Sequence, residues 1–364
     1  MTIIDYKPHD KTHDHHIALQ NGLLDLKAYI RGDETMLQEL TPLWFSETLL
    51  PYEFDPLAIC PRWTNTLISN MGGDLERVSV LQEWAGYLLY PKLDRQRFLA
   101  IEGEGGNGKS VFLAGLTAML GTQNVSNIPL ESFSSRFALI GTLGKMANIA
   151  SDCGELDKAD EGKLKTFTTG ERMDFDRKGL PSINTSPTAK LILAFNNRPR
   201  FSDRTGGLWR RMLLVPFDVV IKDDDKIWGL DDHMVWEASG ECPGIFNWAL
   251  EGLKRLLDQK DFTKPAACES ALEDYRTEVN PAKAFLKEKC SAGAEEDFVI
   301  VRDLYTAYKE WSADSGYRSL GERQFGKEVK RIFMKVERKQ NRVVGGREWR
   351  YYGLLHGTGT DSGF

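Results

Sequence analysis

The stretch that most constrains this chain is "GEGGNGKS" at residues 103–110, which follows the pattern G-x-x-x-x-G-K-S. The apolar run "RFLAI" precedes it, and the apolar helical run "VFLAGLTAML" follows it. A strand, a glycine-rich loop and a helix in this order form a phosphate loop, whose backbone N–H groups and helix N-terminus face phosphate oxygens. The sequence therefore predicts an α/β core that binds a nucleotide.

The phosphate loop assigns chemistry to two side chains. We expect Lys109 to neutralise the β- and γ-phosphates and Ser110 to hold Mg²⁺, so the predicted cofactors are ATP and Mg²⁺. The residues expected to surround the nucleotide form one continuous run: Gly103, Glu104, Gly105, Gly106, Asn107, Gly108, Lys109, Ser110 and Val111.

Polar residues follow two further runs that read as buried strands. "KMANIAS" is followed by Asp152 and, one short turn later, Glu155, whereas "AKLILAF" is followed by Asn196. Because parallel strands place their carboxyl ends at one sheet edge, we expect these residues near the phosphate loop. Asp152 would bind Mg²⁺, Glu155 would act as base, and Asn196 would hydrogen-bond the γ-phosphate and the attacking water. A solvated acidic loop and a turn asparagine remain the alternatives.

The stretch "NNRPRFSDRTGGLWRRM" holds five arginines in a chain of net charge −6. Arg210 and Arg211 form an adjacent pair between Trp209 and the strand-like run "MLLVPF". We expect the bulky indole to pack nearby and to fix the direction of the pair. The other three arginines are expected in a surface loop that faces a neighbouring subunit or DNA: Arg198, Arg200 and Arg204.

Changes in the spacing of apolar residues along the chain predict five parts. Apolar spacing near 3.6 in the first ninety residues predicts helices, and the following runs alternate strand and helix. The expected parts are a helical domain (1–92), the nucleotide-binding core (93–225), a helical lid or linker (226–279), a terminal module (280–355) and a disordered tail (356–364).

The terminal module is basic although the chain is acidic. Residues 318–350 contain eleven Lys and Arg against four Glu, and local charge determines a nucleic-acid footprint. Helices at 282–290, 302–315 and 321–333, followed by a hairpin around "VVGG", predict a winged helix that contacts DNA phosphates. A merely solvated basic face is the alternative. The basic residues expected to face DNA are Arg323, Lys327, Lys330, Arg331, Arg338, Lys339, Arg342 and Arg347.

Composition limits where the chain works. It has no apolar run of membrane-spanning length, and its N-terminal residues lack the apolar core of a secretion signal, so we expect a cytoplasmic protein without a membrane partner. Its five cysteines are scattered without a C-x-x-C pair, which indicates free thiols. The segment "HDKTHDHH" has metal-ligand chemistry, but we interpret it as a polar arm and assign no metal to it.

The order of phosphate loop, acidic strand end, asparagine strand end and arginine pair resembles superfamily 3 helicases of the AAA+ class. "HHIALQNGLLDL", "LPYEFDPLAICPRWTNTL" and "LQEWAGYLLY" are similar to the helical domain of the phage and plasmid primase-helicases related to the poxvirus primase-helicase. "NPAKAFLKEKC", "VRDLYTAYKEWSADSG" and "RQFGKEVK" are similar to their C-terminal region. The resemblance implies a fold class: an AAA+ P-loop ATPase core with an N-terminal helical domain and a C-terminal winged-helix domain.

The resemblance also implies a function. It suggests an ATP-hydrolysing replicative DNA helicase or translocase of a mobile element, assembled as a homo-oligomeric ring, expected to be a hexamer, on single-stranded and duplex DNA. Arg211 would be the arginine finger with Arg210 beside it, and a basic hairpin in "LKTFTTGERMDFDRK" would touch the strand through Lys165, Arg177 and Lys178. A primase or polymerase is a candidate partner. A non-translocating initiator or packaging-type ATPase, and an ATP-switched DNA-binding regulator, remain alternatives.

Overall fold

The structure, a computed structural model, describes residues 15–40, 46–151, 158–199, 201, 206–222, 224, 226–344 and 346–357. The chain separates into two units, Met1–Leu272 and Glu273–Phe364, with the division inside helix α8 (Ala266–Glu278). Among the described helices, none combines the length and the apolar character needed to cross a bilayer.

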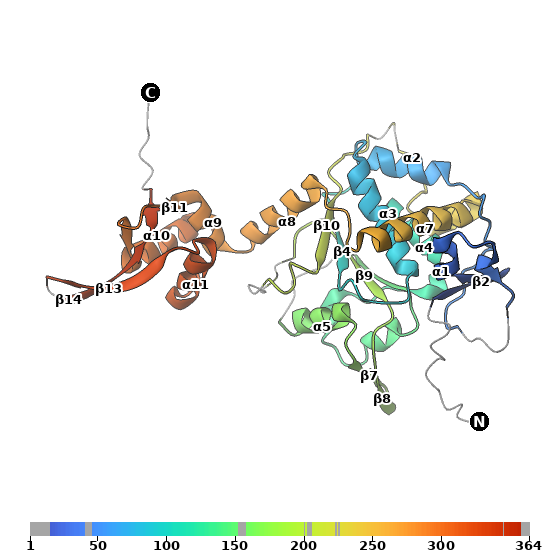
Figure 1. The fold of residues 1–364 in the computed structure, drawn as a ribbon, viewed down its shortest axis with the longest axis horizontal. Helices are drawn as coiled ribbons and strands as arrows, with labels where there is room; N and C mark the ends of the chain where they lie inside the picture. The colour runs from blue at the N-terminus through green and yellow to red at the C-terminus, as the bar shows by residue number, and fades with distance from the viewer. Residues whose placement is uncertain are drawn as a thin grey trace. The chain divides into compact units, whose positions relative to one another are not determined.

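A parallel five-stranded sheet forms the centre of the first unit (Figure 1). Its strands are, from edge to edge, β10 (Met212–Pro216), β4 (Phe98–Glu102), β9 (Lys190–Phe195), β6 (Ala147–Ser151) and β5 (Val125–Ser126). Every residue of β9 is buried, as expected for a parallel strand that is covered on both faces. The α/β nature of the core predicted from the sequence is therefore confirmed.

The strand register brings three strand ends to one edge of the sheet. Glu102 pairs with Phe195, and Ala194 pairs with Ser151, in neighbouring parallel ladders. The phosphate loop follows β4, and the segment that begins at Asn196 follows β9. These two segments therefore start side by side, and the second of them starts next to the end of β6.

Helices pack around this sheet and share its hydrophobic core. Trp63 and Trp236 are fully buried and meet edge to face, with ring centroids 5.4 Å apart. Figure 1 shows α3, α4 and α7 gathered together beside the sheet. The helices of the first unit that follow its N-terminal region are α2 (Pro61–Asn70), α3 (Leu75–Leu89), α4 (Lys109–Leu120), α5 (Lys158–Thr169), α6 (His233–Ser239) and α7 (Cys242–Gln259).

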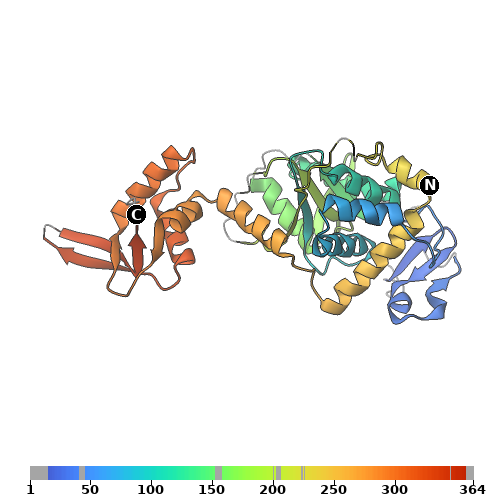
Figure 2. The same cartoon turned by 90° about the horizontal axis from the view of Figure 1, so that it is seen from above.

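The N-terminal region differs from the all-helical prediction. It begins with a three-stranded antiparallel sheet, which Figures 1 and 2 show at the edge of the unit near α7. The strands on either side of Gln20 and Asn21 are only four residues long, too short for their periodicity to distinguish strand from helix. The elements are β1 (His16–Leu19), β2 (Gly22–Asp25), α1 (Leu26–Arg31) and β3 (Leu37–Gln38).

Short elements complete the first unit. The hairpin of β7 (Met173–Arg177) and β8 (Leu180–Thr185) extends beyond α5 in Figure 1. Single turns of 3₁₀-helix occur at η2 (Glu34–Met36), η3 (Thr122–Asn124), η4 (Leu130–Ser132) and η5 (Leu139–Thr142).

The second unit contains the three helices and the hairpin expected from the sequence, at almost the expected positions. Its own core includes Phe285, Tyr308 and Phe325, and the last two rings stack with centroids 4.4 Å apart. The unit also contains two small sheets, β12-β14-β13 and β11-β15. The elements are α9 (Pro281–Lys289), β11 (Cys290–Ala292), β12 (Phe298–Ile300), α10 (Val301–Asp314), α11 (Glu322–Ile332), β13 (Glu337–Val343), β14 (Gly346–Tyr352) and β15 (Leu354–His356).

Candidate nucleotide-binding site

The loop between β4 and α4 has the backbone conformation of an anion cradle. Gly105, Gly106 and Gly108 have φ values of +115°, +64° and +84°, which glycine adopts without steric penalty. Helix α4 begins directly afterwards at Lys109, and its N-cap residue is Gly108, which has no side chain to cap the helix. Its first backbone N–H groups, together with the positive end of the helix dipole, therefore suit phosphate oxygens.

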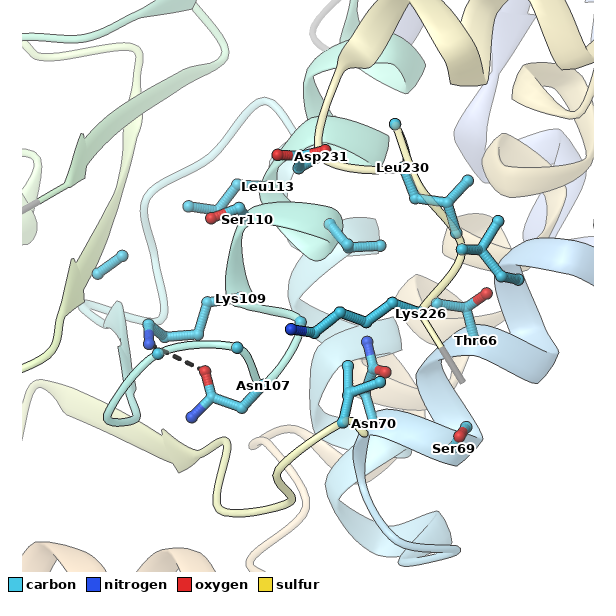
Figure 3. Close-up of a pocket in the computed structure, with 18 of the residues that line it drawn as sticks. Thr66, Ser69, Asn70, Asn107, Lys109, Ser110, Leu113, Lys226, Leu230 and Asp231 are labelled. Carbon is cyan, nitrogen blue, oxygen red and sulfur yellow. Dashed lines mark hydrogen bonds between the residues drawn. The ribbon is translucent and has the colours of Figure 1, made fainter. Parts of the chain in front are cut away.

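Lys109 lies inside this loop. Its side chain is buried, and Nζ donates hydrogen bonds to the Gly103 carbonyl oxygen at 2.6 Å and to Asn107 Oδ1 at 3.1 Å (Figure 3). Asn107 Nδ2 in turn donates to the Phe217 carbonyl oxygen at 2.5 Å. Both of these acceptors are neutral oxygens, and a phosphate oxygen would be a stronger, charged acceptor than either.

A pocket of about 810 Å³ opens over the loop and joins several predicted site residues. Its lining includes every residue from Gly105 to Val111, together with Ser151 and Asn196. Gly103 and Glu104 do not line it, although the Gly103 carbonyl oxygen accepts a hydrogen bond from Lys109. The pocket is large enough for a nucleotide, because small-molecule sites span about 300–1,000 Å³.

The acidic residues predicted for this site, Asp152 and Glu155, lie outside the described residues. Ser151, the last residue of β6, lines the pocket directly before Asp152. Of the two predicted Mg²⁺ ligands, Ser110 is the one within the described part of the chain, and it lines the pocket.

Arg198 has a different place from the one expected. Its guanidinium makes a two-point ion pair with Glu102, with Nε–Oε2 and Nη2–Oε1 distances of 2.8 Å each. It therefore fastens the end of β4 to the segment after β9 instead of projecting from a surface loop. Arg200 and Arg204 lie outside the described residues.

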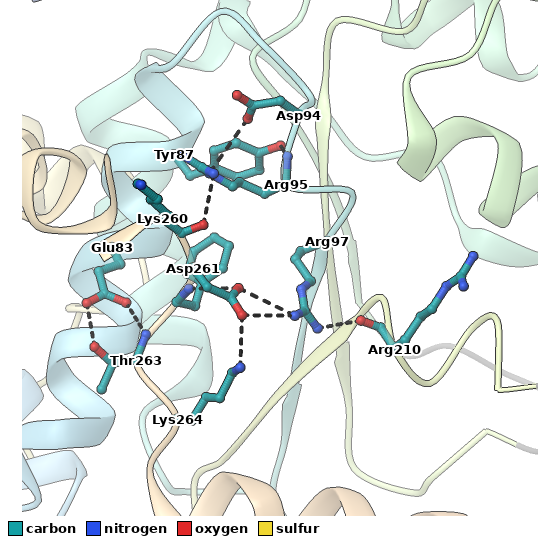
Figure 4. A network of polar contacts seen from close by, with 11 residues as sticks. Glu83, Tyr87, Asp94, Arg95, Arg97, Arg210, Lys260, Asp261, Thr263 and Lys264 are labelled. Atoms are coloured by element: carbon teal, nitrogen blue, oxygen red, sulfur yellow. Dashed lines mark hydrogen bonds and ion pairs between the residues drawn. The ribbon is translucent and has the colours of Figure 1, made fainter. Parts of the chain in front are cut away.

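The two arginines of the adjacent pair differ in exposure. The Arg210 side chain is exposed, and its carbonyl oxygen accepts a hydrogen bond from Arg97, which also pairs with Asp261 (Figure 4). Arg211 is buried, and its Nη1 donates to the Gly207 carbonyl oxygen at 2.5 Å. Trp209 is buried as well, and packs edge to face against Phe201 with centroids 5.9 Å apart. Of these two arginine side chains, Arg210 is therefore at the surface of the chain and Arg211 is not.

Sequence reasoning missed an entire wall of the pocket. One face of α2 lines it, at positions i, i+3, i+4, i+7 and i+8, and the segment 226–231 lines it from another side. The available signal was the amphipathic pattern of α2, in which Trp63 and Leu67 are buried in the core. The lining residues of α2 are Arg62, Asn65, Thr66, Ser69 and Asn70.

The candidate DNA-contacting hairpin has the expected shape. Arg177 pairs with Leu180 across the turn, so Lys178 lies at the tip and is exposed. Arg177 Nε donates to the Pro181 carbonyl oxygen at 2.8 Å and thereby braces the turn. Lys165 lies apart from the tip, half-buried on α5.

In the second unit, α11 has the predicted division into faces. Phe325 and Val329 are buried in the core, whereas the four basic residues predicted on this helix are exposed, and so is Arg342 on β13. Arg331 forms an ion pair with Glu328, with Nη1 and Oε1 3.0 Å apart. The exposed basic residues of α11 are Arg323, Lys327, Lys330 and Arg331.

Comparisons with known proteins match separate parts of the chain. Residues 101–211 match the model "Family of unknown function (DUF5906)", and residues 277–352 match the model "Poxvirus D5 protein-like". The solved structure "The A form apo structure of NrS-1 C terminal region-CTR" is similar over 87% of this chain and 79% of that chain, with TM-score 0.53 and 14% identity. A further structure of the NrS-1 C-terminal region covers 88% and 81%, with TM-score 0.50 and 13% identity. At this identity the likeness concerns the fold.

Proposed function

We propose that this chain is an ATP-hydrolysing DNA helicase or translocase that works in DNA replication as a homo-oligomeric ring. The observation that carries the proposal is the pocket that joins the phosphate loop to Ser151 and Asn196 at the carboxyl edge of a parallel sheet. The match of the second unit to poxvirus D5-like proteins and the fold shared with the NrS-1 C-terminal region support it. We also propose that the first unit is an AAA+ motor of superfamily 3, as the order of its motifs suggests.

In the proposed reaction, the loop N–H groups and Lys109 hold the phosphates of ATP. The lysine exchanges the Gly103 carbonyl and Asn107 oxygens for phosphate oxygens, which places its charge where negative charge develops. Ser110 would hold Mg²⁺, which neutralises phosphate charge, and Asp152 is the second proposed metal ligand. Asn196 lies in the same pocket, where its amide can orient the attacking water.

The resemblance implied Arg211 as the arginine finger with Arg210 beside it, and we propose to exchange the two roles and assign the finger to Arg210. A group that reaches the nucleotide of a neighbouring subunit has to leave its own surface, and Arg210 is exposed whereas Arg211 is buried. The hydrogen bond from Arg97 to the Arg210 carbonyl oxygen, backed by Asp261, fixes the backbone that presents this side chain. Arg211 then acts as a positioning residue through its bond to the Gly207 carbonyl oxygen.

DNA contact is proposed at two basic elements. Lys178 at the tip of the β7–β8 hairpin would follow the phosphates of a single strand, which needs charge but no base readout. The exposed basic face of α11 and the β13–β14 hairpin would contact duplex DNA in the manner of a winged helix.

Hydrolysis and strand displacement by the full chain test this function together. We expect ATP hydrolysis that single-stranded DNA stimulates, and displacement of one strand of a forked duplex only with ATP and Mg²⁺. Lys109→Ala should abolish both activities while the protein keeps its thermal midpoint. Hydrolysis without displacement, in any assembly state, would contradict a helicase.

That last result would favour a second function, an ATP-switched initiator or regulator that binds DNA. The observation behind it is that the basic face of α11 belongs to a unit with its own core. Duplex binding whose affinity changes with ATP in the wild-type chain, but not in Lys109→Ala, would identify this function.

A further inference from the structure

The pocket over the phosphate loop extends beyond the space that phosphates need. The loop forms one side of its 810 Å³, and the other sides are formed by α2 and by the segment 226–231. Lys226 extends from this segment into the space between the loop and α2 (Figure 3). The residues proposed to hold the phosphates and Mg²⁺ belong to neither α2 nor the segment 226–231.

Helix α2 gives the pocket a polar wall with hydrogen-bonding capacity. Its other face is anchored, since Trp63 stacks on Phe112 of α4 with centroids 5.8 Å apart. The wall therefore has a fixed position relative to the phosphate loop. Amide and hydroxyl groups along it can both donate and accept, as the edges of a nucleobase and a ribose require.

Asn70, at the last turn of α2, has an unmet hydrogen-bonding need. Only 3% of the residue is exposed, and Nδ2 has no hydrogen-bond partner among the described residues. The amide lies against the end of the phosphate loop, because a Cβ added to Gly108 would come within 2.1 Å of Nδ2. A buried donor without a partner is destabilising, so a ligand oxygen at this point would be stabilising.

The opposite wall presents apolar surface to solvent. Ile227 and Trp228 both line the pocket, yet they are 60% and 84% exposed. Small-molecule pockets are lined mainly by apolar and aromatic side chains with a few placed polar groups, and these two residues supply the apolar part here. An indole suits the π-face of a base, and stacking of this kind tolerates any base because every base has a π-face.

We propose that the space between α2 and residues 226–231 is a nucleoside subsite. The base lies between the polar face of α2 and the side chains of Ile227 and Trp228, and the Asn70 amide donates to a ribose oxygen. The inference rests on the proposed nucleotide binding at the phosphate loop and adds what the loop cannot provide, preference for a nucleoside triphosphate over inorganic phosphate chains.

Binding of two ligands to the full chain tests this subsite: ATP, and inorganic tripolyphosphate, which offers phosphates without a nucleoside. The wild-type chain should bind ATP more tightly than tripolyphosphate. Trp228→Ala should lower ATP affinity about 5- to 150-fold, and Asn70→Ala about 2- to 10-fold, with tripolyphosphate affinity unchanged. Leu57→Ala, at an exposed apolar residue that does not line the pocket, is the matched control and should change neither affinity.

Each other outcome has a distinct meaning. Equal binding of ATP and tripolyphosphate, with no effect of Trp228→Ala, overturns the subsite but leaves the phosphate loop intact. Equal weakening of both ligands in Asn70→Ala assigns that amide to phosphate and overturns its assigned ribose contact. Absence of binding by either ligand, in wild type as in Lys109→Ala, overturns the nucleotide site itself.

Discussion

Solvent exposure distinguishes the roles of arginine residues that have the same charge. Two adjacent arginines with the same charge have opposite surroundings, because Arg210 is exposed to solvent, whereas Arg211 is buried and donates to the Gly207 carbonyl oxygen. Arg198, which the local sequence places among surface arginines, is instead half of an ion pair with Glu102. Charge alone could not separate these three roles.

The arginine pair gives the first prediction. Arg210→Ala should lower ATP hydrolysis of the assembled protein by about 10³ without changing its thermal midpoint, because only a transition-state contact is lost. Arg211→Ala should instead destabilise the first unit by about 1–3 kcal/mol, since the half-buried Gly207 carbonyl oxygen loses a charged donor. Hydrolysis rates and urea unfolding of the two variants separate these effects.

A mixing experiment checks that the finger acts between subunits. Lys109→Ala subunits offer an intact Arg210, and Arg210→Ala subunits offer an intact phosphate loop, so mixed assemblies should regain part of the hydrolysis. No recovery in mixtures that demonstrably co-assemble would count against shared sites.

The second prediction concerns Lys190, which lies at the start of β9 and is almost completely buried. Its Nζ donates to the Tyr90 carbonyl oxygen and lies 5.3 Å from the centre of the Tyr87 ring. Burial lowers the pKa of Lys190 from 10.5 to about 7. Between these values the unfolded chain binds the extra proton, so the free energy of unfolding should rise with pH.

Lys190→Met removes this titration. The variant should gain stability over wild type, most of all below pH 7, and the gain should shrink as pH rises toward 10.5. Urea midpoints at pH 6, 8 and 9.5 measure it, with exposed Lys163→Met as the control. A gain that is the same at all three values would show that the buried lysine does not titrate in this range.

At the scale of elements, α2 and α11 illustrate how one helix serves two purposes. Each buries an apolar stripe that fixes its position and turns a polar stripe outward, toward the pocket in α2 and toward solvent in α11. Because the apolar stripe is packed in the core, the polar stripe on the opposite face has a fixed position. The functional face of each helix therefore depends on the packing of the opposite face.

The third prediction belongs to α11. Lys327→Ala and Lys330→Ala should each weaken duplex binding by a similar factor for all sequences and reduce the salt dependence by about one phosphate contact. Lys309→Ala on α10, an exposed lysine on another helix of the same unit, is the control. Fluorescence anisotropy against salt concentration measures both quantities, and a sequence-dependent loss would indicate base readout instead.

At the scale of the whole molecule, two hydrophobic cores imply two units that fold separately. The second unit also has its own polar link, in which Glu273 bonds Lys283 and Lys287 at 2.7 and 2.5 Å. Although burial alone would raise the pKa of Glu273, these hydrogen bonds lower it to about 2. This link stabilises the folded unit above pH 4.5 and is lost as pH falls toward 2.

The fourth prediction follows from the two cores. A fragment of residues 266–364, which keeps α8 and Glu273, should unfold cooperatively and bind duplex DNA, whereas residues 1–265 should bind ATP without duplex affinity. Thermal melts and anisotropy measure these properties. A molten or DNA-inactive 266–364 fragment, beside a full chain that binds duplex DNA, would mean that the units depend on each other.

The sequence by itself determined the elements whose signals are local. The phosphate loop, the strands before Asn196 and Asp152, and the helices of the second unit are each specified by neighbouring residues and a repeating apolar period. Short apolar runs were the exception, because the β1–β2 hairpin offers too few residues for a period to emerge.

Only the tertiary structure decided which distant residues share a site. It placed Asn70 against Gly108, paired Arg198 with Glu102, and exposed Arg210 while burying Arg211. These relations join segments up to about a hundred residues apart, where no periodicity connects the partners. Their physical basis is close packing, which sets exposure and contact through the whole fold and leaves no trace in a short window of sequence.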